Sequence, residues 1–114
     1  MIEVKVERAA NGALRKLSSA GHARAERSAA CVALTTLLKS TARALATRPE
    51  LGMSGTAPHP GVMQIELAAP KAAGAEYACG ITELLLAGLQ ELAEEFPDEV
   101  RLSVGSEEAA AAGR

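Results

Sequence analysis

The chain has 114 residues, with 12 basic and 14 acidic side chains and a formal net charge of −2. Its hydrophobic share of 48% includes 25 alanines, one Tyr, one Phe and no Trp, so a small domain with a thin core is expected. Scarce aromatic residues and near-zero charge argue against a direct nucleic-acid partner, and no apolar run approaches the about 20 residues of a membrane span.

The first predicted element is a β-hairpin at the N-terminus. Residues 2–6 alternate between apolar and charged side chains, the pattern of a strand with one buried face. Asn11-Gly12 predicts a two-residue type I′ turn, so that paired residue numbers sum to 23 and Glu7 faces Lys16. In this register the second strand, residues 14–19, begins with a leucine on the polar face. A bulge in the hairpin or a longer loop is therefore an alternative to the two-residue turn.

Helical and strand patterns alternate through the middle of the chain. Residues 28–46 carry apolar and small side chains at spacings of three and four, which predicts a helix with Ser28 as its N-cap and Glu26 as a rival cap. Residues 52–61 contain several Gly and Pro and are expected to form a loop. Residues 63–67 alternate again and predict a third strand.

The C-terminal part predicts one more helix and one more strand, over residues 74–95 and 100–104. Every strand has one polar face, so both helices are expected on the same side of the sheet. The sequence therefore predicts a single α+β domain over residues 1–106, with the order strand-strand-helix-strand-helix-strand. Its sheet is expected to be mostly antiparallel, with four or slightly more strands. Residues 107–114 are expected to form a flexible tail.

Cysteine and histidine are the residues that could carry chemistry. Cys31 would be the third residue of the helix capped by Ser28, where free backbone N–H groups and the helix dipole favour an anion such as a thiolate. His22 lies just beyond the second strand, and a Cys–His pair is the smallest set of side chains that can carry out covalent acyl transfer. A lone cysteine near a helix start is more commonly a small buried core residue, and chemistry alone leaves both interpretations open. His59 is expected in an exposed loop and Cys79 in helix packing.

The run Gly21-His22-Ala23, followed by Cys31 at the head of a helix rich in Ala, Leu and Thr, resembles the Prp family of ribosomal-processing cysteine proteases. The likeness extends to the length of the chain, the order of its elements, the hairpin before the histidine and the Leu-rich second helix. The resemblance implies that Cys31 is the nucleophile and His22 its general base. Supporting roles are then expected for Gly21, Ala23, Glu26, Ser28 and Thr35.

The chain departs from the family pattern around the cysteine. Family members usually have a longer loop between the histidine and the cysteine, with an Asp three residues before the cysteine, where this chain has Ser28. Thr35 replaces a Ser four residues after the cysteine. Ser28 can cap a helix but cannot supply a carboxylate to orient His22, a role for which Glu26 is the candidate. These differences keep two alternatives open: a ribosome-associated binding module of the same fold without protease activity, and a structural domain in which Cys31 is buried and inert.

The resemblance also implies a substrate and an assembly. Prp-like proteases remove a short N-terminal extension from a large-subunit ribosomal protein, so that extension is the expected partner, and relatives suggest a homodimer. No cofactor and no metal is expected, because the His and Cys residues lack the spacing of a zinc site. The N-terminus shows no secretory signal pattern, and the two cysteines are interpreted as thiols, so a cytoplasmic protein without a membrane partner is expected.

Overall fold

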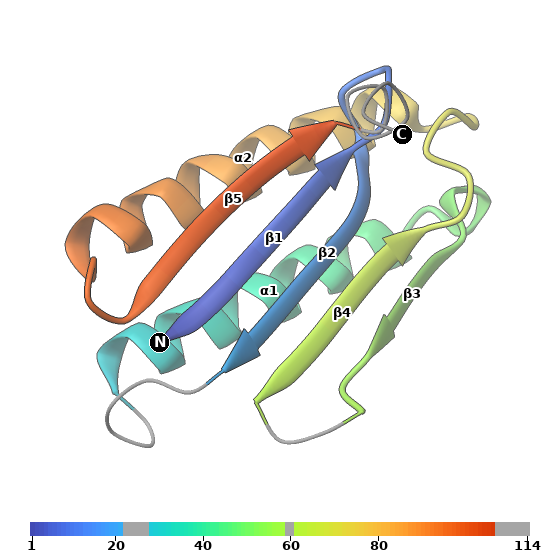
Figure 1. The fold of residues 1–114 in the computed structure, drawn as a ribbon. Helices are drawn as coiled ribbons and strands as arrows, with labels where there is room; N and C mark the ends of the chain where they lie inside the picture. The colour runs from blue at the N-terminus through green and yellow to red at the C-terminus, as the bar shows by residue number, and fades with distance from the viewer. Residues whose placement is uncertain (22–27, 59–60, 107–114) are drawn as a thin grey trace, which may run out of the picture.

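Figure 1 shows a curved sheet with two long helices packed behind it. This computed structural model describes residues 1–21, 28–58 and 61–106. The elements in chain order are β1 (Ile2–Arg8), β2 (Leu14–Gly21), α1 (Ala29–Ala46), the 3-10 helix η1 (Pro49–Leu51), β3 (Met53–Thr56), β4 (Val62–Leu67), α2 (Ala75–Glu95) and β5 (Val100–Ser106). Residues 107–114, for which a tail was predicted, lie outside the described residues.

The described sheet has five strands in the order β3-β4-β2-β1-β5. Strand β2 pairs antiparallel with β1 and β4, and β4 with β3, whereas β5 runs parallel to β1. The α+β class is confirmed, and the expected sheet of four or slightly more, mostly antiparallel strands is a mixed sheet of five strands, in which only the pairing of β5 with β1 is parallel among the described residues. Strand β3 falls in the segment expected to be a loop, because its four residues include a glycine and lie mostly exposed, which leaves no alternation to detect.

The β1–β2 hairpin has the predicted register along most of its length but a different turn. Glu7 pairs with Lys16 as expected, and beyond this pair a bulge shifts the register and brings Leu14 into the core. The N–H of Gly12 donates to the carbonyl oxygen of Ala9 (2.9 Å), and Gly12 adopts φ 91°. This is the arrangement of a type I turn followed by a glycine bulge. The predicted type I′ turn is therefore wrong, and the alternative with a bulge is confirmed.

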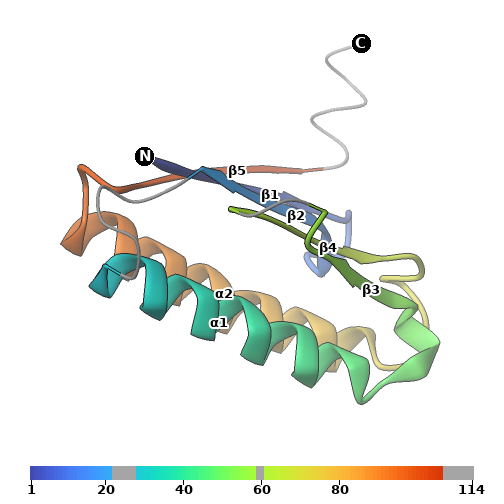
Figure 2. The same cartoon turned by 90° about the horizontal axis from the view of Figure 1, so that it is seen from below.

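Both helices cover the same face of the sheet, as predicted, and leave the other face open (Figure 2). The open face carries charged side chains in cross-strand pairs. Arg101 Nη1 lies 3.6 Å from Glu3 Oε1, and Lys16 Nζ lies 3.7 Å from Glu66 Oε1. Exposed pairs of this kind contribute little to the free energy of unfolding. The stability of the fold therefore comes from the face that the helices cover.

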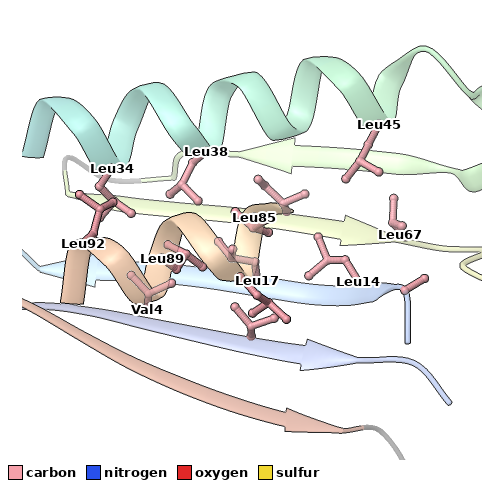
Figure 3. Packing of buried hydrophobic residues seen from close by; sticks show 14 of the residues in the cluster. Val4, Leu14, Leu17, Leu34, Leu38, Leu45, Leu67, Leu85, Leu89 and Leu92 are labelled. Carbon is pink, nitrogen blue, oxygen red and sulfur yellow. The ribbon is translucent and has the colours of Figure 1, made fainter. Parts of the chain in front are cut away.

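The core between sheet and helices is built mainly from leucine (Figure 3). Burying one leucine side chain contributes roughly 1.5–3 kcal/mol, so about ten of them compensate for the scarcity of aromatic residues. The largest fully buried side chains are Leu14, Leu17, Leu38, Leu45, Leu51, Ile65, Leu67, Leu85, Leu89, Val4 and Thr82. Among the described residues, no helix is both long and apolar enough to cross a membrane.

Candidate active site

Helix α1 begins where the sequence predicted, with Ser28 as its N-cap. Ser28 has an extended backbone (φ −60°, ψ 160°), and its Oγ accepts a hydrogen bond from the N–H of Cys31 at 3.1 Å. Its carbonyl oxygen accepts a hydrogen bond from the N–H of Val32 at 3.0 Å. Cys31 is therefore the third residue of the helix, as expected. The rival cap, Glu26, lies outside the described residues.

Cys31 lines an open cleft at the end of the sheet where β2 ends and β4 begins, the end at which α1 also starts (Figure 1). The cleft has a volume of about 470 Å³ and a mostly apolar lining. Helix α1 contributes Cys31, Leu34, Thr35 and Leu38, and the strands and the loop before β4 contribute Ile2, Ser19, Gly21, Ala57, Pro58, Gly61, Val62 and Met63. Cys31 is a free, partly exposed thiol. It is therefore not the buried cysteine that the structural-domain alternative required.

Gly21 ends β2 on the lining of this cleft, in a conformation that requires glycine. Its φ of 114° is one that side chains with a Cβ rarely adopt, and a Cβ there would collide with the carbonyl oxygen of Met1. The N–H of Gly21 donates to the carbonyl oxygen of Gly61 at 3.0 Å, which ties the end of β2 to the residue before β4. The backbone directly before His22 in the sequence is thus fixed by both neighbouring segments.

The structure brings together several of the residues that the sequence singled out. Cys31, Thr35 and Gly21 lie on the lining of one cleft, and Ser28 holds the first turn that carries Cys31. The remaining site residues predicted from the sequence lie outside the described residues; they are His22, Ala23 and Glu26. The pairing of Cys31 with a histidine therefore stays a prediction.

Cys79 lies in a different place. Its Sγ donates to the carbonyl oxygen of Asn11 in the hairpin turn at 3.3 Å, and it packs against the edge of the core. Cys79 and Cys31 are both free thiols. The prediction of a packing role for Cys79 agrees with these contacts, and His59 lies outside the described residues. No group of three or more His, Cys, Asp or Glu within the described ranges could hold a metal ion.

Ser19 is a residue of the cleft that the sequence analysis missed. The residue is 6% exposed and lies on the helix-covered face of β2, two residues after the fully buried Leu17. The period-two alternation of β2 was the signal that could have found it, because residues 17, 19 and 21 share one face of the sheet.

Residues 1–101 match the family described as cysteine protease Prp. The fold is similar to that of SMU.848 from Streptococcus mutans, which is 26% identical with a TM-score of 0.77, over 94% of this chain and 99% of that one. It is also similar to the essential ribosomal processing protease Prp from S. aureus in two complexes. In the complex with a covalently linked product peptide, the protease chain is 20% identical to this chain, with a TM-score of 0.77. In the complex with a substrate peptide the identity is 18% and the TM-score 0.75. Each match covers 91% of this chain and 99% of the S. aureus chain. No curated protein matches the chain.

Proposed function

Because this chain belongs to the cysteine protease Prp family, we propose that it is a cysteine endopeptidase that removes a short N-terminal extension from a large-subunit ribosomal protein precursor. The observation that carries the proposal is the partly exposed thiol of Cys31, which lines an apolar cleft from the first turn of a capped helix. The S. aureus relative binds a substrate peptide, which supports a peptide segment as the occupant of such a cleft.

In the proposed first step, the Cys31 thiolate attacks the carbonyl carbon of the scissile peptide bond and forms a C–S bond. His22 accepts the thiol proton beforehand, as the general base. The N–H groups of Ala29 and Ala30 belong to the first turn of α1 and have no carbonyl partner within the helix. They are the candidate donors for the oxyanion that forms on the attacked carbonyl oxygen.

In the second step, the tetrahedral intermediate collapses, the C–N bond breaks, and protonated His22 gives its proton to the leaving amine. A water molecule then hydrolyses the thioester, with His22 again as the base, and Cys31 is released as the free thiol. Glu26 is the candidate to orient His22. Thr35, whose side chain lines the cleft one turn after Cys31, is the candidate to contact the bound segment.

A binding module without protease activity is the second candidate function. It is favoured by Ser28, which stands where family members usually have an Asp and whose hydroxyl oxygen accepts the N–H of Cys31. Such a module would hold the same N-terminal extension in the cleft without cleaving it. The two functions share the binding site and differ only in the reactivity of Cys31.

The proposal also covers the extent of the domain, the location of the protein and its oligomeric state. We propose that residues 1–106 act as one protease domain, and the family match over residues 1–101 supports this extent. We further propose that the protein works in the cytoplasm as a homodimer. Analytical ultracentrifugation at micromolar concentration tests the dimer, and a single species with the mass of one chain would contradict it.

The proposed activity is tested by incubating the purified protein with the ribosomal protein precursor and following the shorter product by mass spectrometry. Cys31→Ala and His22→Ala should each abolish cleavage, whereas the matched control Cys79→Ala should retain it. Cleavage that survives Cys31→Ala would refute the proposal. A wild-type protein that binds the precursor without cleaving it would instead support the binding module.

The reactivity of the thiol gives a second, independent measurement. A nucleophilic Cys31 should react with iodoacetamide at pH 7 faster than a model thiol, because the thiolate is the reacting form. Cys79 provides the internal comparison, since mass spectrometry of tryptic peptides separates the two alkylation rates. Equal rates at Cys31 and a model thiol would argue against a nucleophilic role.

A further inference from the structure

Strand β5 forms the longer of the two edges of the described sheet (Figure 1). It has seven residues, whereas β3 at the opposite edge has four. On one side β5 pairs with β1, and no described strand lies on its other side. An unpaired edge of this length offers a row of backbone N–H and C=O groups to another strand.

The parallel ladder between β1 and β5 identifies the backbone groups that face outward. The N–H of Ile2 donates to the carbonyl oxygen of Glu99 at 2.7 Å, just before β5 begins. In a parallel pair, the N–H and C=O of every second residue point to the same neighbour. The odd-numbered residues of β5 therefore face β1, and Leu102 and Val104 face outward. Their N–H and C=O groups have no strand partner in the described part of the chain.

The side chains of β5 do not protect this edge. Val104 is 48% exposed, although it pairs with the buried Val6 of β1 and lies on the same face of the sheet. The strand contains no Pro and no Lys, which commonly prevent an edge from pairing. Its one charged residue, Arg101, is paired with Glu3. An exposed apolar side chain beside unpaired backbone groups is typical of a strand that receives a partner.

We propose that β5 pairs antiparallel with β5 of a second copy of this chain, around a two-fold axis that passes beside Ser103. The inference rests on the proposed homodimer and names its interface. Leu102 then pairs with the partner's Val104, so the two residues exchange backbone hydrogen bonds and the exposed valine gains an apolar neighbour. Arg101 faces the partner's Gly105, so no like charges meet.

Other registers use the edge less well. A two-fold axis beside Leu102 would pair Val104 with the partner's Val100, whose N–H group already donates to the carbonyl oxygen of Phe96 at 2.9 Å. An axis beside Arg101 would place two guanidinium groups opposite each other, which is unfavourable. The axis beside Ser103 avoids both problems.

This pairing also explains why the assembly would stop at two copies. A two-fold axis covers both β5 edges at once and joins the two five-stranded sheets into one. The edges that remain are the two copies of β3, which are short and mostly exposed. Each cleft borders Ile2, which pairs with the first residue of β5, so the two clefts lie toward opposite ends of the interface. The interface therefore leaves both copies of Cys31 outside it.

The first test is sedimentation equilibrium at micromolar concentrations. Val104→Lys and Val104→Pro should each raise the dimer Kd by about tenfold or more, because lysine places a charge at the interface and proline removes an outward N–H group. The matched control Ser54→Lys, on the β3 edge, should keep the wild-type Kd. An unchanged Kd in both Val104 variants would overturn the inference while leaving the proposed homodimer intact. A wild-type protein that stays monomeric would refute both, and the protease activity is tested separately by cleavage.

A cross-linking test needs no disruptive variant and reports the register. Ser103→Cys is made in a chain that also carries Cys31→Ala and Cys79→Ala. In the proposed register the two copies of residue 103 have Cα atoms about 4.5 Å apart, within reach of a disulfide. Mild oxidation should therefore give a covalent dimer on a non-reducing gel, and the matched variant Arg101→Cys should not. A covalent dimer at residue 101 alone, or none at either position in a protein that sediments as a dimer, would overturn the inference.

Discussion

The two ends of helix α1 pack on the same sheet but differ in how completely they are closed. At the C-terminal end, Leu45 is fully buried, and Tyr77 Oη donates to the carbonyl oxygen of Ala44 at 3.0 Å. At the N-terminal end, Cys31 lines an open cleft of about 470 Å³. One helix thus has a closed end that fixes its position and an open end that can receive a ligand.

The closed end is held by polar contacts as well as by leucines. Thr47 Oγ1 donates to the same Ala44 carbonyl oxygen at 2.7 Å, and the guanidinium of Arg48 lies 4.4 Å from the centre of the Tyr77 ring. The two hydrogen bonds satisfy the carbonyl of Ala44, one of those that a helix end leaves without an intrahelical partner, and the guanidinium of Arg48 makes a cation–π contact with the Tyr77 ring. A helix anchored in this way can present Cys31 in one place although the packing around Cys31 is incomplete.

The largest expected effect on stability comes from Gly21 at the open end. Gly21→Ala should lower the free energy of unfolding by about 3–4 kcal/mol, because the positive φ is strained for alanine and its Cβ collides with the carbonyl oxygen of Met1. Urea unfolding measures the change. The control is Gly80→Ala, since a Cβ at Gly80 meets nothing within 4 Å and alanine is the better helix former. Equal stability of Gly21→Ala and the wild type would show that the end of β2 can rearrange.

A pair of leucine truncations compares the two ends directly. Leu45→Ala should lower the free energy of unfolding by about 3 kcal/mol, because it leaves a closed cavity. Leu34→Ala should cost less, about 2 kcal/mol, because the removed atoms border a cleft that water already enters. Thermal and urea unfolding of both variants give the two values. Equal losses would mean that the N-terminal end is as closed as the C-terminal end.

The contrast between the ends also explains what the sequence could predict. The cap at Ser28, and with it the position of Cys31, depends on local side-chain chemistry and was correctly predicted. The Glu7–Lys16 pairing followed from alternation in two adjacent segments, and it is confirmed as well. Each of these features joins residues that are close in the sequence, so the spacing of their side chains is enough to predict it.

Features that depend on distant segments were harder to predict. Strand β3 is short and mostly exposed, so its pairing with β4 left no pattern in the sequence. The parallel pairing of β5 with β1 was not specified by the sequence, because one polar face on each strand does not distinguish a parallel from an antiparallel neighbour. Strands β1 and β5 run parallel, and their side chains Glu3 and Arg101 form an ion pair on the face of the sheet that the helices leave open. The burial of Ser19 likewise depends on α1, which comes later in the chain and lines the same cleft.

The smallest expected effects distinguish stability from positioning at the two ends. Ser28→Ala removes the cap of the first turn and Tyr77→Phe removes one hydrogen bond near the last, so each should lower the free energy of unfolding by about 1 kcal/mol. Only Ser28→Ala should also lower kcat/KM for the precursor, by about tenfold, because Ser28 Oγ holds the N–H of Cys31 and orders the turn that carries the thiol. Urea unfolding and cleavage assays on the same preparations separate the two effects. If Tyr77→Phe lowers kcat/KM as much as Ser28→Ala does, the cap has no positioning role beyond its contribution to stability.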